Sequence, residues 1–149
     1  PINRSCLDQT TNDRTISGAS PRFTIPEPGL EEDGHLTEVR ALDISTGREA
    51  WRYSQRAPNM GSTLATAGNV VFFGDLNRRL RAFDAETGTV LWETILGSQI
   101  TGYPVTYAVG DRQYLTVPVG GVNNNLATYT PELEAPNGSN MLVTFALPN

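Results

Sequence analysis

Two copies of one eleven-residue pattern constrain the fold of this chain more than any other feature. Residues 41–51 and residues 82–92 both read A-x-D-x-x-T-G-x-x-x-W, and the copies lie 41 residues apart. Strand-like runs flank both copies. A repeat of roughly 40–45 residues built from short strands is typical of the blades of a β-propeller. The spacing therefore predicts an all-β chain made of similar sheets arranged side by side.

The residues of the motif have a structural explanation. An Asp at the end of a strand accepts backbone N–H groups of the next turn, and the Gly supplies the positive φ of that turn. The Trp lies on the return strand, where its ring covers the seam between sheets and its indole N–H reaches a carbonyl. We therefore interpret Asp43, Asp84, Trp51 and Trp92 as structural. The functional alternative is a carboxylate base beside an aromatic platform.

The composition agrees with short strands and limits the classes of partner. The chain of 149 residues is 38% hydrophobic and contains 14 Gly and 10 Pro, which suits strands separated by many turns. A net charge of −5 without a basic stripe argues against nucleic acid. No apolar run reaches ~18 residues, so we expect no membrane span. The single Cys6 and the single His35 match no disulfide or metal-ligand pattern.

The repeated pattern resembles the tryptophan-docking motif of the quinoprotein alcohol dehydrogenases, eight-bladed propellers that carry pyrroloquinoline quinone (PQQ). Residues 61–75 are similar to the family stretch G-x-x-ATAG-x-VF-x-G-D, and residues 102–114 to the segment G-x-P-x-TY…x-QY. Residues 138–148 resemble a common family ending. The resemblance covers nearly all of residues 36–149.

This resemblance implies a partial β-propeller, with about two and a half four-stranded antiparallel blades of an eight-bladed ring. Residues 1–35 are expected to form an irregular segment with a short strand end. Within residues 36–149, we expect the outer half of one blade at 36–55, a complete blade at 62–96, and a last blade lacking its fourth strand at 102–149. The chain is thus expected to be the carboxy-terminal part of a longer protein.

The family resemblance also implies where the chemistry lies. In such enzymes an Asp acts as general base on the alcohol, hydride passes to PQQ, and a Ca²⁺ or lanthanide ion polarises the quinone. The metal ligands and the catalytic Asp belong to earlier blades, so no catalytic or metal-binding residue is implied in this chain. Asn3 matches the Asn of the family's x-N-x-x-C-M-D, whose side chain reaches PQQ. Met60 lies where methanol-dehydrogenase-like members often place a Trp near the quinone edge.

The function implied by the resemblance is that of a periplasmic PQQ-dependent alcohol dehydrogenase that passes electrons to cytochrome c or a quinone. The chain would contribute propeller closure and part of the PQQ pocket, and alone it is expected to be inactive. Two alternatives remain: a non-catalytic propeller that binds partner proteins as a scaffold, and a unit that completes a ring with copies of itself. The Asn-rich loop at 120–140 lacks the G-G-W of many members. Together with Met60, that departure leaves the particular alcohol open.

Overall fold

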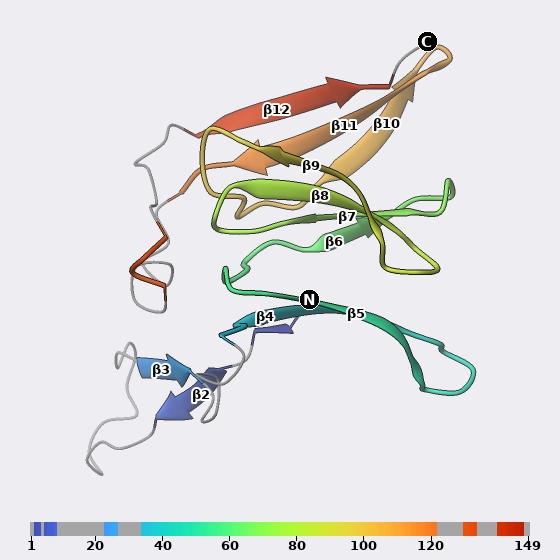
Figure 1. Cartoon of the computed structure of the whole chain (residues 1–149). Helices are drawn as coiled ribbons and strands as arrows, with labels where there is room; N and C mark the ends of the chain where they lie inside the picture. The colour runs from blue at the N-terminus through green and yellow to red at the C-terminus, as the bar shows by residue number, and fades with distance from the viewer. Residues whose placement is uncertain are drawn as a thin grey trace, which may run out of the picture.

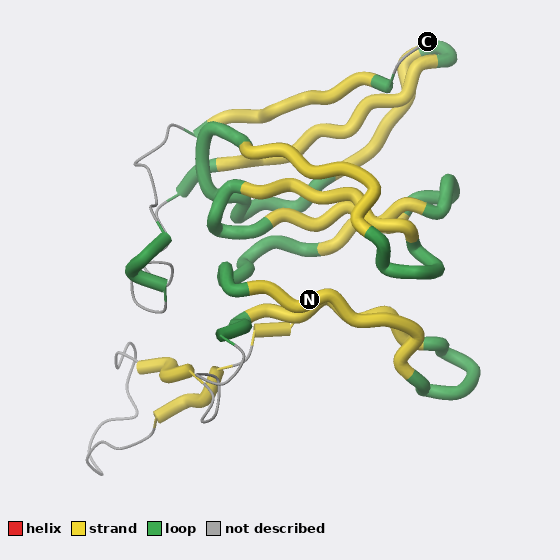
Figure 2. The backbone as a smooth tube through the Cα atoms, in the orientation of Figure 1, coloured by secondary structure: helices red, strands yellow, loops and turns green. Residues whose placement is uncertain are grey.

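Strands are the regular elements of the described part of the chain. The structure is a computed structural model that describes residues 2–3, 5–8, 23–26, 34–121, 130–133 and 140–147. Within these ranges no helix is present that could cross a membrane. Figure 2 shows strands joined by loops and turns. The strands are β1 (Ile2–Asn3), β2 (Ser5–Asp8), β3 (Phe23–Pro26), β4 (Thr37–Leu42), β5 (Glu49–Gln55), β6 (Thr63–Ala65), β7 (Val70–Gly74), β8 (Arg79–Asp84), β9 (Val90–Ile95), β10 (Val105–Val109), β11 (Arg112–Val119) and β12 (Met141–Ala146).

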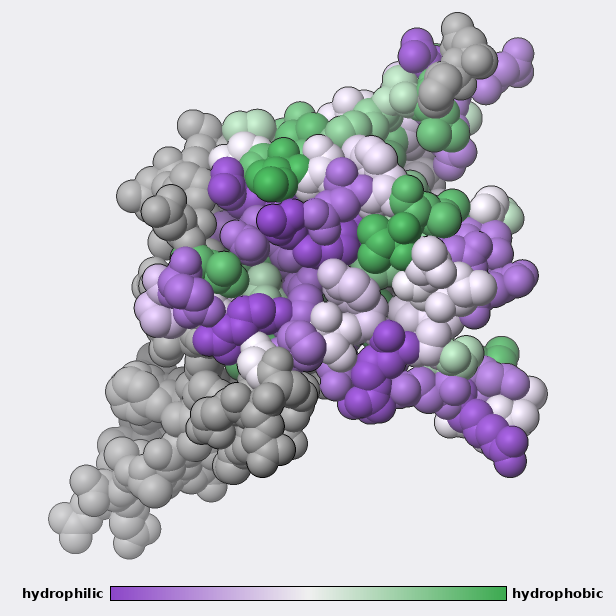
Figure 3. All heavy atoms as spheres, viewed as in Figure 1, coloured by the Kyte–Doolittle hydropathy of each residue, from purple (hydrophilic) through white to green (hydrophobic). Residues whose placement is uncertain are grey.

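Three antiparallel sheets lie side by side, as Figure 1 shows. The first sheet has the order β1-β4-β5, the second β6-β7-β8-β9 and the third β10-β11-β12, while β2 and β3 form a separate pair. Consecutive strands pair within the second and third sheets, so each sheet is a simple up-and-down meander. Polar side chains cover much of the face seen in Figure 3, with apolar patches between them.

The apolar core lies between the sheets rather than at one centre. The first core joins the first and second sheets and consists of the buried side chains of Val39, Phe73 and Phe83. The second core joins the second and third sheets and consists of those of Leu80, Leu96, Ile100, Leu115, Val117 and Val119. Residues 70–73 of β7 form an apolar run without alternation, which predicts cover on both faces. Phe73 belongs to the first core and Phe72 packs against the second, which confirms that prediction.

Trp51 joins the first sheet to the second in the manner that the motif predicts. Its indole Nε1–H donates to the carbonyl oxygen of Ala85 at 2.8 Å, and its ring stacks on Phe83 with centroids 6.1 Å apart. The ring also lies against Gly88, where an added Cβ would be 2.6 Å from Trp51 Cδ2. Only a residue without a side chain permits that approach. The seam role of Trp51 is therefore confirmed.

The two Asp residues of the motif accept hydrogen bonds from the turns that follow them. Asp43 Oδ1 accepts the backbone N–H of Ser45 at 2.8 Å, and Asp84 Oδ1 accepts that of Thr87 at 2.8 Å. The turn glycines have φ values of +69° and +72°. The Ser45 side chain is the main cause that lowers the pKa of Asp43 below 3.8, and the Thr87 backbone does the same for Asp84. The predicted turn role of both Asp residues is confirmed.

Trp92 occupies the second seam less completely. Its ring meets Phe145 of the third sheet edge to face, with centroids 5.4 Å apart, and the residue is 40% exposed. Its indole N–H makes no hydrogen bond among the described contacts. A largely apolar cavity of about 610 Å³ lies beside it, lined by residues such as Phe72, Leu91 and Ala146. Trp92 thus faces the next sheet as predicted, but without the carbonyl contact that Trp51 makes.

The first sheet contains a strand that the sequence did not predict for it. The prediction gave this blade two strands within residues 36–55, whereas β1 adds a third, pairing Ile2 with Glu38 and Asn3 with Thr37. A strand of two residues is too short to show the alternation by which strands are recognised. Strands β2 and β3 pair within residues 1–35, where the sequence predicts an irregular segment with a short strand end.

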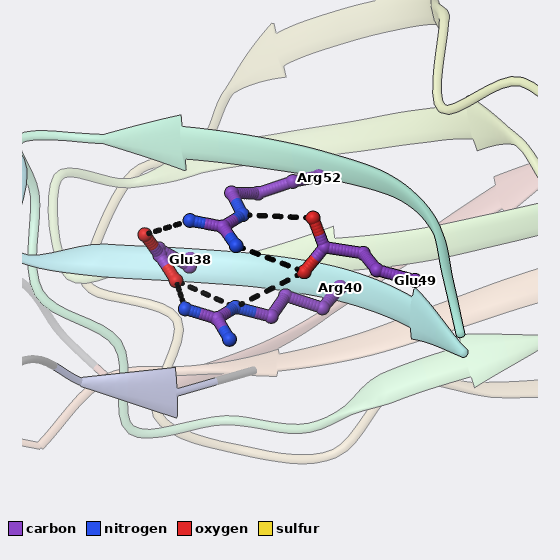
Figure 4. A network of polar contacts seen from close by, with 4 residues as sticks. All are labelled: Glu38, Arg40, Glu49 and Arg52. Atoms are coloured by element: carbon purple, nitrogen blue, oxygen red, sulfur yellow. Dashed lines mark hydrogen bonds and ion pairs between the residues drawn. The ribbon is translucent and has the colours of Figure 1, made fainter. Parts of the chain in front are cut away.

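Charged residues occupy the face of the first sheet that points away from the second sheet (Figure 4). The buried carboxylate of Glu38 accepts from Arg40 Nε at 2.6 Å and from Arg52 Nη1 at 3.3 Å. Arg52 also donates to both carboxylate oxygens of Glu49 at 3.0 Å. Side chains alternate between the two faces of a strand, so Glu38, Arg40 and Arg52 lie opposite the apolar first core. A register shift between Ala41 and Leu42 places one extra residue between Glu49 and Trp51, which brings Glu49 to the same charged face.

Candidate functional site

Met60 lies in the connection between the first and second sheets. This connection, called the first linker, comprises residues 56–62. Ala57 and Asn59 of the linker are each 5% exposed, whereas Met60 is 47% exposed. Buried neighbours therefore fix the linker, and Met60 presents an accessible thioether at the end of the sheets.

Asn3 is brought to the same end of the first sheet. The strand pairing places Asn3 beside Thr37, and Thr37 beside Gln55, the last residue of β5. The first linker begins directly after Gln55, so the two predicted cofactor contacts belong to one end of the sheet. The structure describes the backbone of Asn3, while its side chain lies outside the described part.

A second linker, residues 96–104, runs beside the first. An added Cβ on Gly61 would lie 2.8 Å from the carbonyl oxygen of Gly102, so the two backbones are in contact there. Thr101 Oγ1 donates to the carbonyl oxygen of Gly120 at 2.7 Å, which joins the second linker to the third sheet. Here we call Met60, Gly61, Thr101, Gly102 and Gly121 the linker surface. Much of it is backbone, and the missing side chains of Gly61 and Gly102 let neighbouring segments of the chain pack closely.

The turn at residues 74–78 connects both linkers to the second sheet. The Leu76 N–H donates to the carbonyl oxygen of Pro58 at 3.1 Å, and Asn59 Nδ2 donates to that of Gly74 at 3.0 Å. On the other side, the Ile100 N–H donates to the carbonyl oxygen of Asp75 at 3.1 Å. The Leu96 N–H also donates to the carbonyl oxygen of Arg78 at 2.8 Å, so this turn holds each linker through two hydrogen bonds.

A buried ion pair fixes this turn. Asp75 is 0% exposed and accepts from Arg81 Nη1 at 2.8 Å and from the Arg79 N–H at 3.0 Å. The same guanidinium nitrogen donates to Gln55 Oε1 of the first sheet at 2.8 Å, and the guanidinium lies over the Tyr53 ring. Burial raises the pKa of Asp75 above 3.8, and the hydrogen bond from Arg81 partly offsets that rise.

The linker surface is suited to binding rather than to proton transfer. It offers a thioether, a hydroxyl and backbone groups, and the nearby Asp75 carboxylate is inaccessible. No group of three His, Cys, Asp or Glu that could hold a metal ion occurs in the part of the chain that the structure describes. Thr101 and Gly121 were missed from sequence. Thr101 lies 41 residues after Met60, so applying the repeat period to Met60 would have found it.

Comparison with known proteins agrees with this architecture. Residues 54–115 match the family described as PQQ glucose/ethanol/alcohol dehydrogenase, beta-propeller domain. The quinoprotein alcohol dehydrogenase PedH of Pseudomonas putida is 38% identical over 130 residues, which are 85% of this chain and 21% of PedH. The 1-butanol dehydrogenase (cytochrome c) of Thauera butanivorans is 43% identical over 109 residues, which are 72% of this chain and 15% of that protein.

Solved structures give the same result. A europium-containing methanol dehydrogenase matches 65% of this chain and 17% of its own, with 30% identity and a TM-score of 0.59. The quinohemoprotein alcohol dehydrogenase of Comamonas testosteroni matches 56% of this chain and 12% of its own, with 42% identity and a TM-score of 0.53. The class of the protein is therefore a PQQ-type β-propeller, present here in part, which confirms the predicted fold.

Within that class, the chain is similar to the quinoprotein alcohol dehydrogenases, through the family match at residues 54–115 and through relatives that are 38% and 43% identical. It spans about a fifth or less of the length of the curated relatives described above.

Proposed function

We propose that this chain is part of a PQQ-dependent alcohol dehydrogenase that works in the periplasm and passes electrons to cytochrome c or a quinone. The observation that carries the proposal is the continuous similarity to quinoprotein alcohol dehydrogenases over 85% of the chain. Blades at residues 36–55, 62–96 and 102–149 belong to an eight-bladed ring in this proposal, and residues 102–149 take part in closing the ring.

The linker surface fits a flat cofactor. PQQ, when bound, supplies the two-electron acceptor for the alcohol, with a Ca²⁺ or lanthanide ion whose ligands the family resemblance places in earlier blades. Met60 packs its polarizable thioether against the ring system, and Asn3 binds a polar edge. Gly61 and Gly102 let the two linkers and Pro118 pack closely, because a Cβ on Gly61 would lie 2.8 Å from the carbonyl oxygen of Gly102 and one on Gly102 would lie 2.6 Å from Pro118 Cβ. The role of this chain is to bind and orient the cofactor and to exclude water, and alone it is inactive.

The proposal is tested by dye-linked alcohol oxidation with the complete protein that contains this chain. We expect alcohol-dependent dye reduction that requires both added PQQ and Ca²⁺ or a lanthanide ion. Absence of turnover and of PQQ binding would refute the dehydrogenase and leave the protein-binding scaffold.

A matched pair of variants tests the contact itself. Met60→Ala should weaken PQQ binding by about tenfold, since a sulfur–aromatic contact contributes up to about 1.5 kcal/mol. Met141→Ala removes the other methionine, which lies on β12 and is similarly exposed at 41%, and should leave PQQ binding unchanged. Equal effects of the two substitutions would remove Met60 from the pocket.

A further inference from the structure

Asp75 lies in the turn that is hydrogen-bonded to both linkers. Its turn bonds to Pro58 and Asn59, the two residues before Met60, and to Ile100, the residue before Thr101. Met60 and Thr101 are also equivalent in the 41-residue repeat. The same turn therefore fixes the backbone immediately before two equivalent positions of the linker surface.

The carboxylate of Asp75 cannot act directly on a ligand. It is fully buried, and its oxygens bond to Arg81 and to the backbone of Arg79. Arg81 in turn reaches across the seam to Gln55, directly before the first linker. Exposed ion pairs contribute little to holding a structure, whereas removing one partner of a buried pair leaves the other charge uncompensated.

We propose that Asp75, held by Arg81, is a positioning residue that sets the spacing between Met60 and Thr101 on the linker surface. Where the linker surface binds PQQ, an inference that rests on the proposed function, this spacing determines how closely the cofactor is held. The effect of Asp75 on the linkers is a property of this chain and does not depend on the cofactor.

The two methionines of the chain report on the two linkers separately. Met60 belongs to the first linker. The Met141 side chain lies beside Gly97 of the second linker, because a Cβ added to Gly97 would be 3.4 Å from Met141 Cε. Labelling the full chain with ¹³C-methyl methionine therefore gives two NMR signals. Asp75→Asn keeps the shape of the side chain and removes its charge. We expect Asp75→Asn to shift both methyl signals.

Two further variants separate positioning from general destabilisation. Asn59→Ala removes the bond to Gly74 and leaves the bond between Ile100 and Asp75 in place, so the Met60 signal should shift and the Met141 signal should stay. Asp84→Asn is the matched control, because it makes the same change in the turn at the other end of β8, and both signals should stay. Circular dichroism of each variant shows whether it is folded.

Unmoved methyl signals in folded Asp75→Asn would overturn the proposal. Should Asp75→Asn fail to fold, Asn59→Ala decides, and an unmoved Met60 signal there overturns it. In the complete protein, Asp75→Asn should raise the Kd for PQQ by about tenfold or more, as loss of a supporting residue behind a binding site commonly does. Wild-type protein that binds no PQQ would refute the proposed function, while the two methyl signals would still decide the role of Asp75.

Discussion

The contact between Trp51 and Gly88 predicts a large penalty for adding one methyl group. In Gly88→Ala, the new Cβ would lie 2.6 Å from Cδ2 and 2.7 Å from Cε3 of the indole ring. Carbon atoms prefer separations of about 3.5–4.0 Å, so the ring would have to move by about 1 Å. Overpacking of this kind costs about 1–3 kcal/mol. The positive φ of +72° adds about 1–2 kcal/mol for a residue with a side chain.

The first repeat provides a matched control for this substitution. Gly47 occupies the same position of the motif with φ +69°, and nothing lies within 4 Å of an added Cβ. Gly47→Ala therefore keeps only the backbone cost of about 1–2 kcal/mol, against about 2–5 kcal/mol for Gly88→Ala. Urea unfolding followed by circular dichroism gives both free energies of unfolding.

A double substitution identifies the source of the difference. In a Trp51→Leu background, the excess cost of Gly88→Ala over Gly47→Ala should fall towards zero, because the ring that the methyl group displaces is gone. Equal costs of Gly47→Ala and Gly88→Ala in the wild-type chain would refute the contact between this ring and the turn.

Three further predictions concern the other contacts. Trp51→Phe should destabilise the chain by about 0.5–1.5 kcal/mol through loss of the hydrogen bond to Ala85. Trp92→Phe should change the free energy of unfolding by no more than about 0.5 kcal/mol in the same urea assay. A larger effect at Trp92 than at Trp51 would contradict the difference between the two seams. Because folding lowers the pKa of Asp84, the stabilising effect of its carboxylate is present above pH 3.8 and is lost as the pH falls through the lower folded-state pKa. Asp84→Asn should therefore flatten the decline in the urea midpoint of unfolding below about pH 4. A decline equal to that of the wild type would contradict this role of Asp84. Glu38→Gln should lower the free energy of unfolding by about 1–3 kcal/mol, because Glu38 is buried between two Arg residues. Glu132→Gln breaks one exposed ion pair and should lower it by about 0–1 kcal/mol. The reverse order would be inconsistent with the network in Figure 4.

Local spacing explains which structural roles could be predicted from sequence. Asp43, Asp84 and Trp51 carry their roles in the motif itself, because the turn and the return strand lie within eleven residues. The apolar run of β7 likewise shows its burial directly. Met60 and Asn3 came from resemblance to a family, and their contact with a cofactor stays a prediction.

Contacts between distant segments could not be predicted in the same way. The partners of Arg81 include Gln55, which lies 26 residues away in another sheet, and no periodicity connects the two residues. The pairing of β1 with β4 joins residues 34–36 positions apart through a strand of two residues. The seam at Trp92 is less complete because the third sheet places no carbonyl oxygen beside the indole N–H among the described contacts. The motif alone does not determine that contact.

The proposed contact with the cofactor is tested most directly by the position of PQQ relative to Met60 in a crystal structure of the complete protein with its cofactor. We predict that the Met60 sulfur lies within about 4 Å of the PQQ ring system, at the end of the sheets where the two linkers meet. PQQ bound at a distance from the linker surface, with Met60 in contact only with protein or solvent, would contradict it.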